Sequence, residues 1–266
     1  MTEIIREIAG PADLRALHRG NPSRYPFLLQ STSRSGTLGR YDILFASPRD
    51  ALVAGDDVCF LDELDARWLN ERVDATDSEL PFQGGWFLYL GYELAGEIEP
   101  ALELSPDPLL PRAYAVRCTA ALVFDHETKL CHMVRETNHD IDREALRAEV
   151  DELRLFHEQH ANKATSVHEE EAGIFTSAVA RAREYIAAGD VYQANLSRSW
   201  VTAGDFDACD IYESLCRTNP GPFAGMARWD NVEIISSSPE RLLKIRDGRA
   251  STRPIAGTRP RSDNLQ

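Results

Sequence analysis

Four apolar runs of strand length, separated by turn residues, constrain the fold of the first half of this chain more than any other feature. The runs are Phe27–Leu29, Tyr41–Ala46, Gly85–Tyr92 and Tyr114–Phe124, and segments rich in glycine and proline lie between them. Short apolar runs bounded by turn residues are typical of buried β-strands. We therefore predict that the first 135 residues fold mainly as strands.

The pattern changes after Asp140. Leu146, Val150 and Leu153 recur at the spacing of one helix face, which predicts a helix. The polar stretch that follows has no apolar period, and we interpret residues 161–172 as a linker between two domains. A long surface loop inside a single domain is the alternative interpretation.

The residues after the predicted linker again carry helix and strand patterns. A helix is expected to end at Gly189, because glycine adopts the left-handed conformation that closes helices. Polar and apolar residues alternate from Asp190 to Val201, which predicts a strand. A second helix, with Asp210 as a candidate cap, is expected to stop at Asn219. Three strand-like runs follow: Phe223–Trp229, Val232–Ser238 and Arg241–Arg246.

Composition excludes several classes of protein. Of the 266 residues, 43% are hydrophobic and 27% are charged, as in globular proteins and unlike disordered ones. The formal net charge of −14 argues against a nucleic acid or an anionic membrane as partner. The five cysteines are odd in number, and no membrane-length apolar run or signal peptide is evident. We therefore expect a reduced, cytoplasmic protein.

A hairpin is predicted near the end of the chain. Asp247-Gly248 lies between two strand-like runs, and this dipeptide suits a two-residue turn that needs positive φ twice. Pairing Arg246 with Arg249 would place Glu240 opposite Ile255, unless a bulge near Pro254 moves the register by one. Glu240 and the backbone of Gly257 should then be neighbours.

This neighbourhood suggests chemistry. A carboxylate can act as acid or base, and a glycine lets the backbone approach a ligand carboxylate closely. Glu240 can equally be a strand-end residue that pairs with nearby cations, which is the alternative that composition favours. Residues 241–261 hold one acid, Asp247, and seven cations: Arg241, Lys244, Arg246, Arg249, Arg253, Arg259 and Arg261.

Several motifs occur in an order that resembles a known family. The motifs are Leu28–Ser31, Gly39–Tyr41, Gly84–Tyr92, Ala188–Ser197, Asn219–Phe223, Ser238–Glu240 and Pro254–Arg261. Together they resemble component I of aminodeoxychorismate synthase and of its sister enzyme, anthranilate synthase. The resemblance implies an α+β fold, a two-sheet sandwich with outer helices, incomplete at the C-terminus. It also implies an N-terminal domain over 1–160, a linker over 161–172, and the first part of a chorismate-binding catalytic domain over 173–266.

The resemblance also implies an activity, which is amination of chorismate with ammonia from a glutaminase subunit. It assigns the acid/base role to Glu240 and substrate contacts to Gly257 and Thr258. It further implies an L-tryptophan pocket between the domains. The residues that match this pocket are Ser31, Leu38, Gly39, Arg40, Tyr41, Pro222, Phe223 and Ala224, of which Leu38 and Ala224 also suit simple core packing.

The chain departs from the family pattern at two points. Some aminodeoxychorismate synthases carry a nucleophilic lysine where this chain has Ala256, so a covalent adduct at this position is excluded. The family's Mg²⁺ ligands and catalytic histidine lie downstream of Gln266, so we expect the 266-residue chain to be inactive alone. Aminodeoxychorismate synthase is our first choice, because of Pro222-Phe223 and the Gly84–Leu94 segment. Anthranilate synthase, favoured by Ala256, and a tryptophan-binding fragment without turnover are the alternatives.

Overall fold

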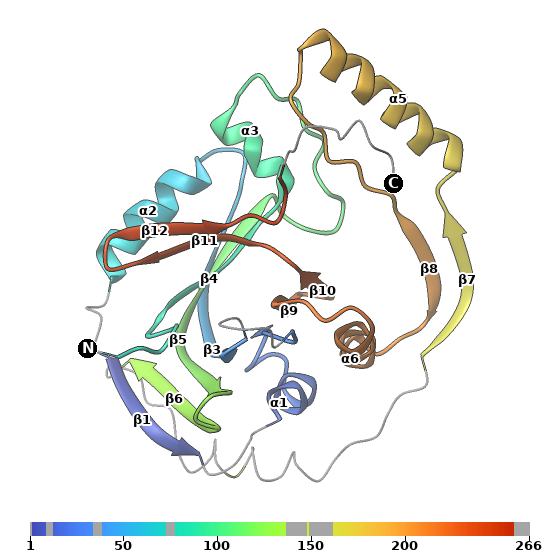
Figure 1. Ribbon diagram of the computed structural model, residues 1–266. Helices are drawn as coiled ribbons and strands as arrows, with labels where there is room; N and C mark the ends of the chain where they lie inside the picture. The colour runs from blue at the N-terminus through green and yellow to red at the C-terminus, as the bar shows by residue number, and fades with distance from the viewer. Residues whose placement is uncertain are drawn as a thin grey trace. The chain divides into compact units, whose positions relative to one another are not determined.

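The computed structural model describes residues 2–8, 13–33, 39–72, 78–136, 148 and 162–257. Most of the secondary-structure elements are strands (Figure 1). They are β1 Thr2–Ile8, α1 Leu14–Gly20, β2 Phe27–Gln30, β3 Tyr41–Val53, α2 Phe60–Glu71, β4 Gly85–Leu90, the 3₁₀-helix η1 Tyr92–Leu94, α3 Ala95–Ile98, β5 Ala113–Asp125, β6 Leu130–Glu136, β7 Lys163–Glu169, α5 Ala172–Ala188, β8 Trp200–Asp205, α6 Ala208–Thr218, β9 Phe223–Trp229, β10 Val232–Ser238, β11 Arg241–Arg246 and β12 Arg249–Arg253.

Eight strands of the described chain form one antiparallel sheet. Seven of them lie in the order β1-β6-β5-β3-β2-β9-β10, and β4 pairs with β5. The short strand β2 joins two distant parts of the sequence, because Phe27 is opposite Phe45 on one side and Ala227 on the other. The predicted α+β class is confirmed, and each apolar run predicted as a strand in the first 135 residues contributes a strand to this sheet, although β4 ends at Leu90 and Tyr92 begins η1.

The long strand β5 organises the sheet. Its first half pairs with β4 and its second half with β6, while β3 pairs along the opposite edge. Twelve of its thirteen residues are buried, the exception being Phe124. A strand covered on both faces needs apolar residues at almost every position, which accounts for the continuous run in the sequence.

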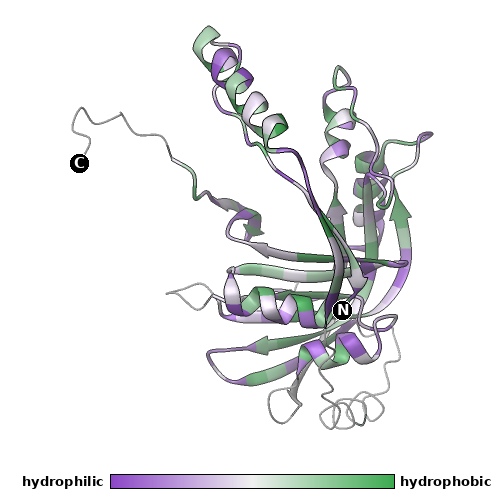
Figure 2. Cartoon of the chain, turned by 90° about the vertical axis from the view of Figure 1, so that its right-hand side faces the viewer, coloured by the Kyte–Doolittle hydropathy of each residue, from purple (hydrophilic) through white to green (hydrophobic). Residues whose placement is uncertain are grey.

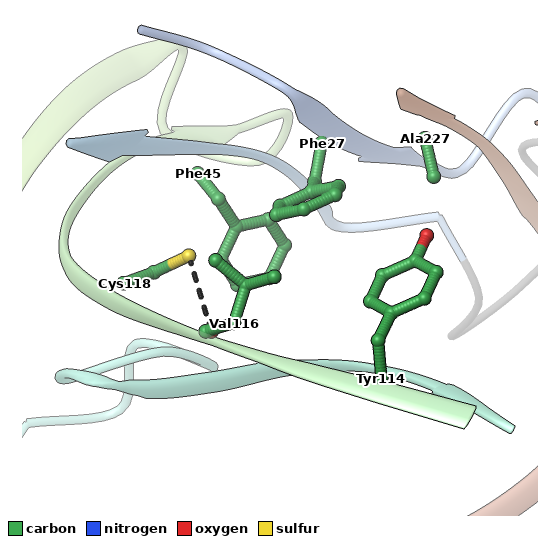
Figure 3. Close-up of a cluster of buried hydrophobic side chains, with 6 residues drawn as sticks. All are labelled: Phe27, Phe45, Tyr114, Val116, Cys118 and Ala227. Atoms are coloured by element: carbon green, nitrogen blue, oxygen red, sulfur yellow. Dashed lines mark hydrogen bonds between the residues drawn. The ribbon is translucent and has the colours of Figure 1, made fainter. Parts of the chain in front are cut away.

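Aromatic rings fill the core against β5. Phe27, Phe45, Tyr114, Val116, Cys118 and Ala227 converge on one another in Figure 3. The Phe27 ring stacks on Phe87 with centroids 3.9 Å apart, and Tyr114 stacks on Trp229 at 4.1 Å. Such pairs add about 0.5–1.5 kcal/mol each beyond the burial of their area. The cluster therefore ties β2, β4, β5 and β9 together.

Contacts divide the chain into two compact units, Met1–Glu158 with Tyr212–Gln266, and Gln159–Ile211. In the second unit β7 pairs with β8, and α5 carries both hydrophobic and hydrophilic residues along its length (Figure 2). Strand β7 lies within residues 161–172, which were predicted to be a linker. Its polar sequence gives no strand pattern, and the strand forms because β8 supplies its hydrogen-bond partners. The division into domains 1–160 and 173–266 stays a prediction.

Two local predictions for this unit have opposite outcomes. Gly189 ends α5 with φ of 85°, and its N–H donates to Ile186, as expected for a left-handed cap. The strand predicted over Asp190–Val201 is wrong except for its last two residues, because β8 begins at Trp200. Alternation alone cannot make a strand, since the ladder needs a partner and β7 is paired only from Trp200 onward.

Three helices differ from expectation. Helices α1 and α2 interrupt the strand-rich first part, and α1 is capped by Asp13, whose carboxylate accepts from the N–H groups of Arg15 and Ala16. The cap of α6 is Asp207 and not Asp210, because the Asp207 carboxylate accepts from the Asp210 N–H at 2.9 Å. The helix predicted after Asp140 lies, apart from residue 148, outside the described residues.

Candidate functional site

Three segments, two of them close in sequence and the third about 180 residues further on, meet where β2 ends. Strand β2 lies between β3 and β9, and Gln30 is opposite Ala224. The ends of these strands therefore bring together residues 30–32, 39–42 and 221–224. Seven residues of the predicted tryptophan pocket fall on these segments: Ser31, Gly39, Arg40, Tyr41, Pro222, Phe223 and Ala224. Leu38, like Thr258 of the predicted substrate site, lies outside the described residues.

Hydrogen bonds hold the first and third segments together. The Ser31 hydroxyl donates to the Pro222 carbonyl at 2.9 Å. Thr32 and Gly221 bond reciprocally, since the Gly221 N–H donates to the Thr32 hydroxyl at 2.9 Å and the Thr32 N–H donates to the Gly221 carbonyl at 3.0 Å. A Cβ at Gly221 would lie 2.7 Å from the Ser237 hydroxyl, so this approach requires glycine.

Asp42 links the same segments to a fourth. Its buried carboxylate accepts from the Ser31 N–H at 3.1 Å and from the Gln30 amide at 2.9 Å. The Nε2 atom of His126 lies 3.0 Å from the same carboxylate. Asp42 was not predicted as a site residue, although an acid between Tyr41 and the apolar run after it is a signal of a buried carboxylate that needs partners.

Arg40 is committed to an internal ion pair. Its guanidinium donates to both oxygens of Asp125, at 3.0 to 3.3 Å, and lies 4.8 Å from the centre of the Tyr41 ring. Burial on its own would raise the pKa of Asp125, but the hydrogen bonds from Arg40 and from the Glu127 N–H outweigh it and lower that pKa. Glu127 lies 3.0 Å from Arg40 as well. The Arg40 charge is therefore neutralised by the protein itself.

The remaining pocket residues differ in burial. Ala224 is only 1% exposed, so it serves the packing between β2 and β10. Phe223 is half-buried, and the guanidinium carbon of Arg241 lies 5.9 Å from the centre of its ring. Gly39 has a φ of 95°, a conformation that favours glycine.

Glu240 follows β10 in an exposed turn. The Ser238 hydroxyl accepts from the Glu240 N–H at 3.3 Å and lies 3.1 Å from the Glu240 carbonyl, which fixes the backbone of the turn. The Glu240 side chain is exposed, and within the described residues its carboxylate forms no ion pair. Among the described residues, no nearby cation therefore neutralises the Glu240 carboxylate, as the alternative interpretation would require.

The predicted hairpin is present, with a shifted base. Arg246 is opposite Arg249 and Lys244 is opposite Ser251, as predicted, but Arg241 is opposite Arg253. The extra residue lies between Arg241 and Lys244 on β11 and not at Pro254. Continued from Arg241, this register places Glu240 opposite Pro254, one residue from the predicted Ile255. Gly257 is exposed, with nothing within 4 Å of the position of a Cβ.

Three further features bear on chemistry. In the described part of the chain, no group of three or more His, Cys, Asp or Glu side chains is arranged to hold a metal ion. All five cysteines are free. None of the helices built from described residues is long and apolar enough to cross a membrane.

Comparisons with known proteins agree on one family. Residues 24–266 match the family model of chorismate binding enzymes. A protein from Synechocystis named anthranilate synthase component I-like protein is 31% identical over 249 residues, covering 86% of this chain and 48% of the relative. Anthranilate synthase component 1 of Thermus thermophilus is 34% identical, with 88% of this chain and 54% of the relative covered.

A solved structure agrees with the fold. Anthranilate synthase component I from Streptococcus pneumoniae superposes with a TM-score of 0.65 at 23% identity, covering 82% of this chain and 54% of that one. The chain spans about half the length of these relatives. The family match covers most of the chain, including the convergent segments and Glu240. This chain belongs to the chorismate-binding enzyme family.

Proposed function

We propose that the chain is part of an aminodeoxychorismate synthase component I, which adds ammonia from a glutaminase partner to chorismate. The observation that carries the proposal is the family match over residues 24–266, which spans the Glu240 turn and the Pro254–Gly257 segment. The likeness of both segments to the family's motifs gives each a role. Glu240 is the acid/base carboxylate, and Gly257 and Thr258 contact the substrate.

The exposed carboxylate of Glu240 is suited to proton transfer. Amination of a ring with loss of a hydroxyl needs a proton at the leaving oxygen and removal of a proton from the entering ammonia, and one positioned carboxylate can serve either step. Glu240 has no ion-pair partner among the described residues that would hold its charge. Gly257, with open space around it, lets backbone N–H groups approach a substrate carboxylate.

Two limits follow from the residues present. Ala256 carries no nucleophile, so no covalent enzyme adduct forms at that position. From the family resemblance we expect the magnesium ligands to follow residue 266, where Mg²⁺ would neutralise charge on the substrate carboxylates. No proton-transfer step above depends on the metal.

The product distinguishes two candidates. Pro222-Phe223 and the Gly84-Gly85-Trp86 motif support aminodeoxychorismate synthase. Anthranilate synthase is the second candidate, favoured by Ala256 and by the names of the relatives. We further propose that Ser31, Leu38, Gly39, Arg40, Tyr41, Pro222, Phe223 and Ala224 form an L-tryptophan pocket, which a fragment without turnover could retain.

Product analysis tests the proposal. The whole polypeptide that contains this sequence would be supplied with chorismate, ammonia and Mg²⁺, and the products separated by chromatography. We expect aminodeoxychorismate as the product. Formation of anthranilate would instead identify the protein as an anthranilate synthase. Glu240→Gln should lower kcat/KM by about 10²–10⁴-fold. Glu103→Gln, which alters an exposed carboxylate outside the site, should leave it unchanged. Full activity in Glu240→Gln would remove Glu240 from its role.

A further inference from the structure

The β11–β12 hairpin gathers positive charge on one of its faces. Side chains of directly opposite residues in an antiparallel pair lie on the same face, and positions alternate along each strand. Arg249, Ser251 and Arg253 therefore share a face of β12, together with their partners Arg246, Lys244 and Arg241. We call this the cationic face, and its five cations are Arg241, Lys244, Arg246, Arg249 and Arg253.

The bulge in β11 completes the cationic face. If β11 kept strict alternation from Arg246 back to Arg241, with no bulge, Arg241 would lie on the other face, with Leu243 and Ile245. The register shift instead places Arg241 directly opposite Arg253. Like charges directly opposite one another are destabilising. The bulge thus creates a pair of cations that the hairpin itself does not need.

Nothing acidic in the described part of the chain offsets this pair. Of the five cations, Arg246 alone forms an ion pair with a described acid, since its Nε lies 3.8 Å from the Asp247 carboxylate. The Nε–H of Arg241 is buried and has no acceptor among the described residues. A buried donor without an acceptor costs free energy, and the cost is larger when the group is charged.

Arg241 also lies at an aromatic surface. Its guanidinium carbon is 5.9 Å from the centre of the half-buried Phe223 ring, and Glu240 is the preceding residue. A planar cation with an unused N–H group beside a half-buried aromatic ring suits a ligand that combines a carboxylate with a planar or cyclic apolar body. Arg40, the arginine of the segments that meet at the end of β2, is already neutralised by Asp125.

We propose that Arg241, assisted by Arg253 across the hairpin, binds the carboxylate of a small ring-containing acid whose ring packs against Phe223. This inference rests on the proposed function and deepens it, because L-tryptophan and chorismate are both acids of this class. The guanidinium of Arg241 donates to the ligand carboxylate, and Arg253 adds a second positive charge. The Phe223 ring then supplies the apolar contact.

Calorimetric titration of the 266-residue chain tests the assignment. The ligands are L-tryptophan, chorismate and benzoate, with L-tryptophanamide as a neutral-end control that lacks the carboxylate. We expect Arg241→Gln to weaken binding of at least one of the three carboxylates about tenfold or more. Tryptophanamide should bind the wild type and Arg241→Gln equally. Arg241→Lys keeps the charge and loses the planar guanidinium, so its affinity for the carboxylates should lie between those of the wild type and Arg241→Gln.

The matched control is Arg249→Gln. Arg249 is on the same face but at the turn end of the hairpin, opposite Arg246, so its loss should leave every affinity within about twofold. Thermal unfolding of each variant verifies that the fold is retained. Wild-type affinity in Arg241→Gln, equal losses for tryptophan and tryptophanamide, or no binding of any carboxylate to the wild type would each overturn the proposal.

The ligands separate this proposal from the proposed function. Binding of tryptophan that is insensitive to Arg241→Gln would support the tryptophan pocket and overturn the role of Arg241. Binding of benzoate that depends on Arg241, without binding of tryptophan or chorismate, would support the carboxylate site and count against the proposed function. Dependence for chorismate alone would identify the substrate as the ligand, and dependence for tryptophan alone would identify the amino acid.

Discussion

Strand β5 and the β11–β12 hairpin are both antiparallel and both follow from clear sequence signals, yet their environments differ. Twelve of thirteen β5 residues are buried, and three strands pair with it. In the hairpin only Arg241 is half-buried, and each strand has the other as its one partner within the described residues. Local signals therefore predict a strand, whereas the number of its partners decides how much stability each side chain contributes.

The largest expected contrast is between an aromatic residue of the core and an apolar residue of the hairpin. Phe27 is 2% exposed and stacks on Phe87, so Phe27→Ala should lower the free energy of unfolding by about 3–5 kcal/mol. Ile245 is 68% exposed, so Ile245→Ala should change it by less than about 0.5 kcal/mol. Denaturant titration measures both. Similar losses would mean that the hairpin packs as tightly as the sheet.

A second contrast compares two glycines with positive φ. Gly84 has φ of 104°, and a Cβ there would collide with the Glu136 carboxylate, which pairs with Arg117 at 2.7 Å. Gly248 has φ of 70° and open space around it. Backbone strain of about 1 kcal/mol applies to both alanine variants, and overpacking adds about 1–3 kcal/mol at Gly84 alone. Equal changes in unfolding free energy would show that the Glu136 side chain moves aside freely.

The smallest contrast concerns two acids and their dependence on pH. The pKa of Asp125 is lowered in the folded chain, so its stabilising effect is present above the ordinary aspartate pKa of about 4 and is lost as the pH falls below it. Asp125→Asn should therefore make the unfolding free energy fall less steeply as the pH is lowered. The change in slope should correspond to less than about one proton taken up on unfolding.

Asp247→Asn is the matched variant in the hairpin. Its ion pair with Arg246 is long, at 3.8 Å, and Asp247 is 90% exposed, so its loss should change stability at neutral pH only slightly. Unfolding free energies measured at several pH values compare the two variants. An unchanged acid profile in Asp125→Asn would contradict the importance of its pair with Arg40.

Patterns with a short physical range predicted much of the fold. The run Tyr114–Phe124, the turn at Asp247-Gly248 and the cap at Gly189 each depend on residues close in sequence. The alternation after Asp190 failed because a ladder depends on a partner that sequence does not name. The bulge was expected near Pro254 and lies on β11 instead. Either strand of a hairpin can carry the extra residue, and the sequence does not show which one does.

The candidate site was predictable only in part. Motif resemblance predicted Ser31, Pro222 and Glu240 as site residues, and the structure brings the first two into hydrogen-bond contact. It did not point to Asp42 or Arg241. The Asp42 carboxylate lies among several hydrogen-bond donors, whereas the buried Nε–H of Arg241 has no acceptor among the described residues. Both properties emerge only when distant segments pack together.

The pairing of β2 with β9 has a consequence for synthesis of the chain. Ser31 and Pro222 are bonded although 191 residues separate them. At about 5–20 residues per second, a ribosome needs roughly 10–40 s to add the missing partner. During that time the edge of β2 that β9 will cover stays open, and an open strand edge invites pairing with other chains. A chaperone that shields this edge until β9 is made should therefore raise the yield of folded protein.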